Sequence, residues 1–352
     1  MRHIWLQFAV MMGLVAAGCH RQVTLSQVYE PPGRLIDVGG RKLHLYCLGS
    51  GSPTVILVAG GGAFSIDWAL VQPRVAETTR ICSYDRAGLA WSDPGSADET
   101  VEQTITDLHT LLQAAGENPP YLLVGASIGG IYIRAYQRAF PGEIAALIFI
   151  NSSNRVGRMV NGKAVLIWDL TEDQIRSTFP LPASAKGSAP TREGEPFDRL
   201  PPALRPVRLW LDRRLWEKWD PSKERPESTL SWRKEFLREF EETDSGRHPL
   251  GQLPVIVLST GPIAGESERQ SRNGAAARLD SLSSNTVHII ATGSGHEIHL
   301  YQPDIVVQSL LRAVSAVRRP APLVSSLTRC HRRFDEFQRR ERQSPIPVPV
   351  AR

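Results

Sequence analysis

The sequence lacks the patterns by which cofactor-dependent proteins are usually identified. Its cysteines and histidines nowhere have the spacing of a metal site, and it contains neither a dinucleotide-binding fingerprint nor a Walker phosphate-binding loop. No internal repeat is evident either. These absences argue against zinc-binding modules, Rossmann-type dehydrogenases, P-loop nucleotide hydrolases and repeat proteins. We therefore expect a protein that needs neither a metal nor a cofactor.

A long hydrophobic run is also missing, apart from a short one at the N-terminus. Residues 4–17 are almost wholly apolar and follow the basic Arg2, but this run is too short to span a bilayer comfortably. It has the form of a signal-peptide core and ends in small residues before Cys19. That ending resembles a bacterial lipobox, which implies a signal peptide over 1–18 and lipidation of Cys19. An ordinary signal peptide is the alternative, and both predict an exported protein, either membrane-anchored or periplasmic or secreted.

Negative charge is scarce at the C-terminus. The chain has 352 residues and a formal net charge of +5, and the segment 318–352 alone carries +6. The rest of the chain is therefore close to neutral, so its folded body needs no nucleic acid or other polyanionic partner. The basic tail is rich in proline and poor in apolar residues, and we expect it to be disordered.

The sequence does contain a dense alternation of predicted strands and helices. A hairpin is expected around Gly39-Gly40, and helices are expected at 66–78, 100–115 and 303–317. The apolar runs that fit buried strands lie at 55–59, 121–124, 144–150 and 255–259. Fully apolar strands that alternate with helices predict a mostly parallel sheet covered on both faces.

This alternation is interrupted between residues 152 and 251. The range is rich in Trp, Arg, Glu and Pro and has no convincing buried strand, and amphipathic helices are expected at 206–219 and 229–242. We interpret it as a helical cap or lid insert, with a merely solvated insert as the alternative. The predicted domain organisation begins with a signal peptide at 1–18 and a first part of the core at 33–151. The insert at 152–251, a second part of the core at 252–317 and the basic tail at 318–352 follow.

The most informative motif is the pentapeptide Gly125-Ala126-Ser127-Ile128-Gly129. It reads G-x-S-x-G and lies between a short apolar strand and a predicted helix. This is the context of a nucleophile elbow, a tight strand-to-helix turn that exposes a serine at the top of a sheet. Ser127 is therefore the candidate nucleophile, and the free N–H groups of the helix N-terminus beside it favour a developing negative charge.

A serine hydroxyl needs a base and hydrogen-bond donors for the oxyanion that its attack creates. His296 is the candidate base because it lies in a glycine-rich loop just past a predicted strand. We expect the oxyanion donors to be the backbone N–H groups of Ile128 and Gly61, the latter within a run of three glycines that lets backbone approach a substrate. A plain flexible turn is the alternative for that run.

In their order, these motifs resemble the α/β-hydrolase superfamily, in the branch with the segment Y-D-R-A-G-L-A-W-S at 84–92. The resemblance covers about residues 35–317 and implies the α/β-hydrolase fold, with a mostly parallel eight-stranded sheet, flanking helices and a helical lid. Two positions depart from the family pattern. Ala59 stands where histidine is common, and Ala90 stands where glycine is common.

The resemblance also implies an activity. It predicts an esterase- or lipase-like serine hydrolase that cleaves a carboxylic ester or related acyl bond of a small molecule through an acyl-enzyme. An acyltransferase or amidase would use the same residues. A binding lipoprotein that keeps the fold without a working catalytic triad is the alternative from another class.

The acid of the triad is the least constrained residue. The resemblance places it after the strand at 255–259, where Glu266 is the first choice and Glu268 its neighbour. A second place used in the family follows the preceding strand, and there the chain has Asn151. An asparagine can hydrogen-bond the His296 imidazole, but it cannot offset an imidazolium charge. We predict Glu266 as the acid, with a solvated loop carboxylate as the alternative.

Asp85 and Arg86 follow a predicted strand and carry opposite charges. Either side chain has the chemistry to act in catalysis. We interpret them instead as a structural pair that organises their own loop.

The resemblance bears on two of the four cysteines as well. In the sheet of this superfamily the second strand runs antiparallel to the fourth, which brings the end of one beside the start of the other. Cys47 lies near the end of the second predicted strand and Cys82 near the start of the fourth. The resemblance thus implies a Cys47–Cys82 disulfide, which export to an oxidising compartment permits. Two buried free thiols are the alternative.

Overall fold

The computed structural model describes residues 28–95, 100–152, 157–160, 163–166, 189–190, 194–218, 248–260, 279 and 281–323. Cys19, Glu266 and Glu268 lie outside these ranges, as does the helix predicted at 229–242. Within the part of the chain that the structure describes, no helix is both long and apolar enough to cross a membrane.

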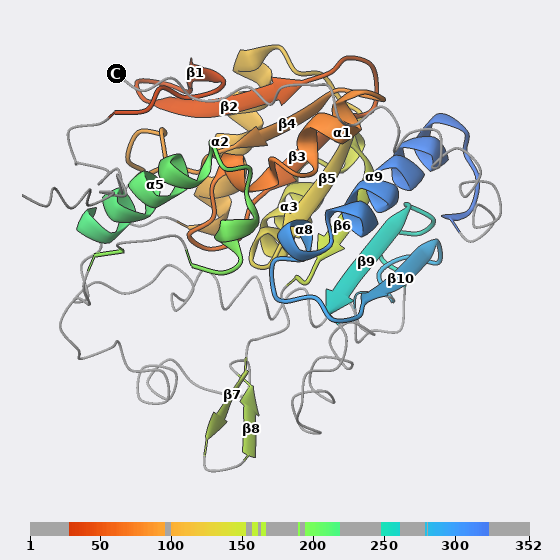
Figure 1. Cartoon of the computed structure of the whole chain (residues 1–352). Coiled ribbons are helices and arrows are strands. Elements are labelled where there is room, and N and C mark those ends of the chain that lie inside the picture. The colour runs from red at the N-terminus through yellow and green to blue at the C-terminus, as the bar shows by residue number, and fades with distance from the viewer. Residues whose placement is uncertain are drawn as a thin grey trace, which may run out of the picture.

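A central eight-stranded sheet organises the fold (Figure 1), and its strand order is β1-β2-β4-β3-β5-β6-β9-β10. Strand β2 runs antiparallel to both of its neighbours, and every other neighbouring pair is parallel. The predicted fold class is thereby confirmed. The strands are β1 (Arg34–Asp37), β2 (Lys42–Leu48), β3 (Thr54–Val58), β4 (Ile81–Tyr84), β5 (Tyr121–Ala126), β6 (Ile144–Ile150), β9 (Val255–Thr260) and β10 (Thr286–Ala291).

Helices cover both faces of this sheet (Figure 1). One face carries α2 (Val101–Ala115) and α3 (Gly129–Ala139), and the other carries α1 (Gln72–Ala76), α8 (Ile298–Tyr301) and α9 (Pro303–Arg318). Successive strand residues point to opposite faces, so the sheet lies between two apolar cores. Leu123 packs into the core under α2 and α3, whereas its neighbour Val124 packs into the core under α1 and α9.

Local sequence sets the ends of the helices. The Thr100 hydroxyl accepts a hydrogen bond of 3.0 Å from the Gln103 N–H and caps the start of α2, and Gly116 ends the helix with a φ of +75°. The helix predicted at 66–78 is instead interrupted, as a 3-10 turn η1 (Ser65–Trp68) followed by α1. Pro73 lies in the first turn of α1, where its missing N–H costs no helical hydrogen bond.

The disulfide lies between β2 and β4. Cys47 and Cys82 are register partners of that antiparallel pair, with Cα atoms 4.0 Å apart, and their Sγ atoms are bonded. The disulfide that the resemblance implied is therefore present. Closing a loop of this size stabilises a fold by about 3–4 kcal/mol in the chain-entropy model.

The range predicted as an insert contains three described elements or pairs of elements. One is α5 (Arg205–Lys218), which matches the helix predicted at 206–219. Another is the short 3-10 helix η4 (Phe197–Arg199). The third is an antiparallel hairpin of β7 (Gly157–Val160) and β8 (Lys163–Leu166), which was not expected from the sequence.

Helix α5 packs on the segment that follows β3. Its Val207, Trp210 and Leu211 lie in one apolar cluster with Phe64 and Ala90. These contacts join the described part of the insert to the loops at the carboxyl ends of β3 and β4.

Candidate active site

Ser127 lies on the turn between β5 and α3, and its side chain is partly exposed. Its φ is +52°, in the left-handed region that residues other than glycine rarely adopt. The turn leaves no room around it. A Cβ at Gly125 would lie 2.6 Å from the backbone of Gly129, and a Cβ at Gly129 would lie 2.3 Å from the carbonyl oxygen of Val58. The two glycines of the motif are therefore required by the geometry of this turn.

The end of β6 supports this strained turn. The Ser127 N–H donates to the Ile150 carbonyl at 3.0 Å, and the Ser152 hydroxyl donates to the Ser127 carbonyl at 2.7 Å. A Cβ at Gly130 would lie 1.6 Å from the Ser152 Oγ, so that glycine is required as well. A left-handed residue costs on the order of 1–3 kcal/mol, and it persists only where such surrounding bonds hold it.

The glycine loop after β3 lies beside Ser127. A Cβ built on Gly60 would lie 3.1 Å from the Ser127 Cβ and 3.8 Å from its Oγ. Gly61 follows and is exposed, while Ile128, the N-cap residue directly before α3, has helical φ and ψ. The structure thus brings together the two backbone segments expected to bind an oxyanion. The individual roles of the Ile128 and Gly61 N–H groups stay predictions.

Arg86 holds the carbonyl groups of this loop. Its guanidinium donates to the Ala59 carbonyl at 2.5 Å and to the Gly60 carbonyl at 2.7 Å, and the side chain is only 7% exposed. The guanidinium also lies over the Tyr132 ring of α3, 5.2 Å from the ring centroid. Asp85 has other partners. The interpretation of Asp85 and Arg86 as one structural pair is therefore corrected, because each side chain organises a different segment.

His296 lies in the loop between β10 and α8 and is partly exposed. The side chain of Asn151, at the end of β6, reaches it. The Asn151 Nδ2 lies 2.8 Å from the His296 Nδ1 and 3.1 Å from the His296 carbonyl oxygen. Asn151 has a φ of +42°, and asparagine tolerates this left-handed conformation better than most residues. Asn151 is thus the orienting candidate that the structure shows in contact with His296.

The register of the sheet places these residues at one edge. Ala126 and Ile150 are partners across the parallel pair β5–β6, so Ser127 and Asn151 follow at adjacent strand ends. His296, which contacts Asn151, is consequently at the same edge as Ser127. The order of these residues in the sequence predicts this shared edge, and the sheet topology accounts for it.

His299 lies close to the candidate base but has a different environment. It is buried and stacks on Trp68, with ring centroids 4.4 Å apart. Burial, with a smaller contribution from His296, lowers the pKa of His299 to about 3. His299 therefore stays neutral at ordinary pH and is not positioned to exchange protons with solvent.

A buried ion pair anchors α5 to η1. The Arg208 Nε lies 2.8 Å from the Asp67 Oδ1, and the two side chains are 2% and 1% exposed. The Arg208 guanidinium lies over two aromatic rings, 4.2 Å from the Phe64 centroid and 3.9 Å from the Phe197 centroid. Burial raises the pKa of Asp67 to about 6, and the Arg208 charge opposes that rise. No local pattern in the sequence indicated this pair.

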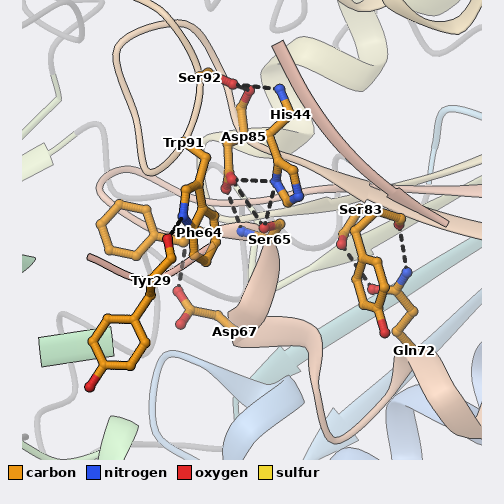
Figure 2. A network of polar contacts seen from close by, with 11 residues as sticks. Tyr29, His44, Phe64, Ser65, Asp67, Gln72, Ser83, Asp85, Trp91 and Ser92 are labelled. Carbon is orange, nitrogen blue, oxygen red and sulfur yellow. Dashed lines mark hydrogen bonds and ion pairs between the residues drawn. The ribbon is translucent and has the colours of Figure 1, made fainter. Parts of the chain in front are cut away.

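A second cluster of serine, histidine and aspartate is fully buried (Figure 2). The Asp85 Oδ2 lies 2.7 Å from the His44 Nδ1 and 3.1 Å from the Ser65 Oγ, and that Oγ lies 3.3 Å from the same ring nitrogen. In a catalytic relay the serine and the acid contact opposite ring nitrogens, whereas here both contact Nδ1. This cluster is therefore structural, and it fixes η1 against β2 and the end of β4.

One group of possible metal ligands lies together in the described part of the chain. The ligand atoms of Cys47, Cys82 and Glu117 are within 4.8 Å of one another. The two cysteines form the disulfide and so offer no thiolate, and Glu117 forms a two-point contact with Arg80 at 2.6 and 3.1 Å. These residues therefore do not fit a metal ion.

Known proteins resemble this chain to different extents. It is 24% identical over 284 residues to the Bacillus subtilis protein YqjL, across 79% of this chain and 90% of that protein. It is 32% identical over 127 residues to a Hormonema carpetanum protein named "Probable transporter efuK", across 34% of this chain and 18% of that protein. The chain thus spans well under two thirds of the length of that relative.

The fold has solved counterparts. An esterase from Thermogutta terrifontis has 19% sequence identity and a TM-score of 0.54, with 79% of this chain and 94% of that chain covered. A bromoperoxidase from Bacillus anthracis has 15% identity and a TM-score of 0.55, with 80% and 99% covered. The model of the alpha/beta hydrolase family matches residues 55–309, most of the chain. This protein therefore belongs to the alpha/beta hydrolase family, a family of hydrolytic enzymes.

Proposed function

We propose that this protein is a serine hydrolase that cleaves a carboxylic ester or a related acyl bond. The observation that carries the proposal is the backbone of Ser127. Its left-handed φ, its glycine neighbours and the glycine loop beside it together form the arrangement that presents a serine nucleophile to a substrate.

The reaction begins with attack of the Ser127 Oγ on the acyl carbon, while the His296 Nε2 takes the hydroxyl proton. The negative charge moves to the former carbonyl oxygen, which the N–H groups of Ile128 and Gly61 bind. When the tetrahedral intermediate collapses, the leaving alcohol receives the proton from His296 and an acyl-enzyme remains. Water then attacks this ester with His296 as the base, and the carboxylic acid is released.

The group that orients His296 decides whether this proton transfer works. The Asn151 Nδ2 is close to a backbone carbonyl oxygen and to the His296 Nδ1, so it donates to both. A neutral imidazole that accepts at Nδ1 carries its own proton on Nε2, and in that tautomer it cannot take a proton from Ser127. An acceptor for an Nδ1 proton is therefore needed. We propose that Glu266 supplies it.

A second assignment rests on the observed contact. If the amide of Asn151 turns over, its Oδ1 accepts from the His296 Nδ1 and leaves Nε2 free as a base. Asn151 would then hold the ring without offsetting its charge. The 2.8 Å separation of the Asn151 amide from the His296 Nδ1 supports this assignment, but the turned amide would place Oδ1 about where Nδ2 now faces the His296 carbonyl oxygen at 3.1 Å, so that carbonyl must move away. The acid variants described in the Discussion separate this assignment from the first.

A fluorophosphonate probe, which phosphonylates an activated serine, tests the proposal directly. We expect the wild-type protein to be labelled and Ser127→Ala to remain unlabelled. Ser65→Ala is the matched control, because Ser65 also lies close to a histidine but is buried, and this variant should label like the wild type. A wild-type protein without labelling or turnover would favour a binding protein that retains only the fold. If the wild type is labelled, turnover of acyl esters of graded chain length defines its acyl-chain preference.

We further propose that the chain is exported and anchored through a lipid on Cys19. The apolar run at 4–17 and the small residues before Cys19 support this, as does the Cys47–Cys82 disulfide, since disulfides persist in oxidising compartments. Wild-type protein should partition with membranes, and Cys19→Ser should be released or fail to be processed. A fully soluble wild type with an N-terminus downstream of Cys19 would leave only an ordinary signal peptide.

A further inference from the structure

Arg86 contacts the glycine loop in a way that bears on catalysis. It is the second residue after β4. Its two terminal nitrogens donate to two consecutive backbone carbonyl groups, those of Ala59 and Gly60. A peptide unit is planar and trans, so its N–H points away from its C=O. By fixing these two carbonyls, Arg86 also fixes the directions of the Gly60 and Gly61 N–H groups.

The loop has little else to hold those directions. The four residues Ala59-Gly60-Gly61-Gly62 carry no polar side chain, and glycine backbone rotates with little steric resistance. The Gly60 carbonyl receives one further bond, at 3.3 Å from the Ala63 N–H. If the peptide between Gly60 and Gly61 rotated, a carbonyl dipole would replace an N–H and would repel a negative charge.

The guanidinium itself is held in place. It is almost fully buried and lies over the ring of Tyr132, which belongs to the helix that begins beside Ser127. Arg86 therefore links three segments that meet at the nucleophile: the end of β4, the loop after β3 and α3. Because the glycine loop is held before the reaction starts, its N–H donors can stabilise the developing negative charge without rearranging.

We propose that Arg86 is a positioning residue of the oxyanion hole. This inference rests on the proposed function. Arg86 does not touch the substrate. It holds the peptide planes of the glycine loop so that the Gly61 N–H meets the oxyanion, and its contribution is therefore realised in the transition state rather than in substrate binding.

The test compares two arginines at opposite ends of β4. Arg80 directly precedes the strand. Like Arg86 it donates several hydrogen bonds, but its acceptors are the Glu117 carboxylate and the Gly49 carbonyl oxygen. We expect Arg86→Gln to lower kcat by about 10²-fold, comparable to the loss of one oxyanion donor, with KM nearly unchanged. Arg80→Gln should lower the Tm but leave kcat near the wild-type value.

A tetrahedral adduct gives a readout that a purely structural role would not move. An alkyl boronic acid forms such an adduct on an activated serine, and we expect Arg86→Gln to weaken its binding by about the same factor as kcat. Arg86→Lys should recover part of both losses, since one ammonium can still donate to one of the two carbonyls. It also serves as the test variant if Arg86→Gln does not fold.

The possible results separate two failures. If Ser127→Ala abolishes turnover but the folded Arg86 variants keep wild-type kcat and boronate affinity, the positioning role is wrong and the proposed function stands. An equal loss of kcat in Arg86→Gln and Arg80→Gln would also overturn the positioning role. Turnover that survives Ser127→Ala would instead overturn the proposed function.

Discussion

Two clusters that contain a serine and a histidine lie at the same edge of the sheet, and they differ in almost every physical respect. The cluster of Ser65, His44 and Asp85 is buried and contains a carboxylate. Its serine donates to the aspartate, and its histidine uses one ring nitrogen for both neighbours. It has the residue types of a catalytic triad without the arrangement.

The cluster of Ser127, His296 and Asn151 is the reverse. Its members are partly exposed, two of them have positive φ, and an amide stands where a carboxylate would complete a triad. A strained residue costs stability and persists where its surroundings enforce it. Strain and access, rather than the set of residue types, therefore distinguish the candidate catalytic site from a structural network.

Removing each serine should give the largest contrast. We expect Ser127→Ala to lower kcat by about 10⁴–10⁶-fold while leaving the fold intact, and His296→Ala to do the same. Ser65→Ala removes only a buried hydrogen bond, worth about 1 kcal/mol, and should keep its turnover. Steady-state kinetics on one ester, with circular dichroism as the check on folding, measures all three variants. Near-normal turnover in Ser127→Ala would mean that Ser127 is not the nucleophile.

The acid gives the next largest effect. The buried cluster has Asp85 beside its histidine, whereas the exposed one has Asn151 there, and the first of the two proposed assignments takes the acid from Glu266. We expect Glu266→Gln to lower kcat by about 10²–10⁴-fold, because the imidazolium loses its compensating charge. Glu268→Gln is the matched control and should have little effect. A harmless Glu266→Gln together with a damaging Asn151→Leu would assign the orienting role to Asn151.

Much of the fold was predictable because its signals are local. Apolar runs define the buried strands, and the cap at Thr100 and the glycine at Gly116 mark the ends of one helix. The nucleophile elbow was predictable for the same reason, since its glycines are required within five residues. Ala90 stands where the family commonly has glycine, and its φ of +43° shows why glycine is favoured there.

The missed features depend on contacts between distant segments. The hairpin β7–β8 has strands of only four residues, too short for alternation to be distinguished from chance. The pair of Arg208 with Asp67 joins segments far apart in the sequence, and neither residue has a local pattern that indicates burial. The sequence leaves Asn151 as one of two candidate partners of His296, and the contact itself joins residues 145 positions apart, which no local pattern can indicate.

Stability should respond most to the carboxylate of the buried cluster. Asp85→Ala removes the acceptor of the His44 ring, the Ser65 hydroxyl and the Ser65 N–H, and leaving these donors buried costs about 3–5 kcal/mol. Asp37→Ala is the control, since that exposed carboxylate also accepts two backbone N–H bonds but solvent can replace it. Urea unfolding measures the difference. If Asp85→Ala and Asp37→Ala lost the same free energy of unfolding, the buried carboxylate would not stabilise the fold more than the exposed one does.

The smallest expected effect is the pH dependence of stability that the buried His299 causes. The pKa of His299 is lowered by burial to about 3, whereas an unfolded histidine titrates near 6.5. Below pH 6.5 the His299 imidazole therefore binds a proton in the unfolded chain but not in the folded protein. The free energy of unfolding consequently falls as the pH decreases toward 3. Between pH 7 and pH 5 this loss should be about 2 kcal/mol.

His299→Phe isolates that contribution, because a phenyl ring keeps the stack on Trp68 and has no titrating group. Urea unfolding of the wild type and the variant at pH 7 and pH 5 should give a fall in stability that is smaller in the variant by about 2 kcal/mol. An equal pH dependence in wild type and His299→Phe would mean that His299 takes up a proton while folded. The contrast between the buried, neutral His299 and the partly exposed candidate base His296 would then be lost.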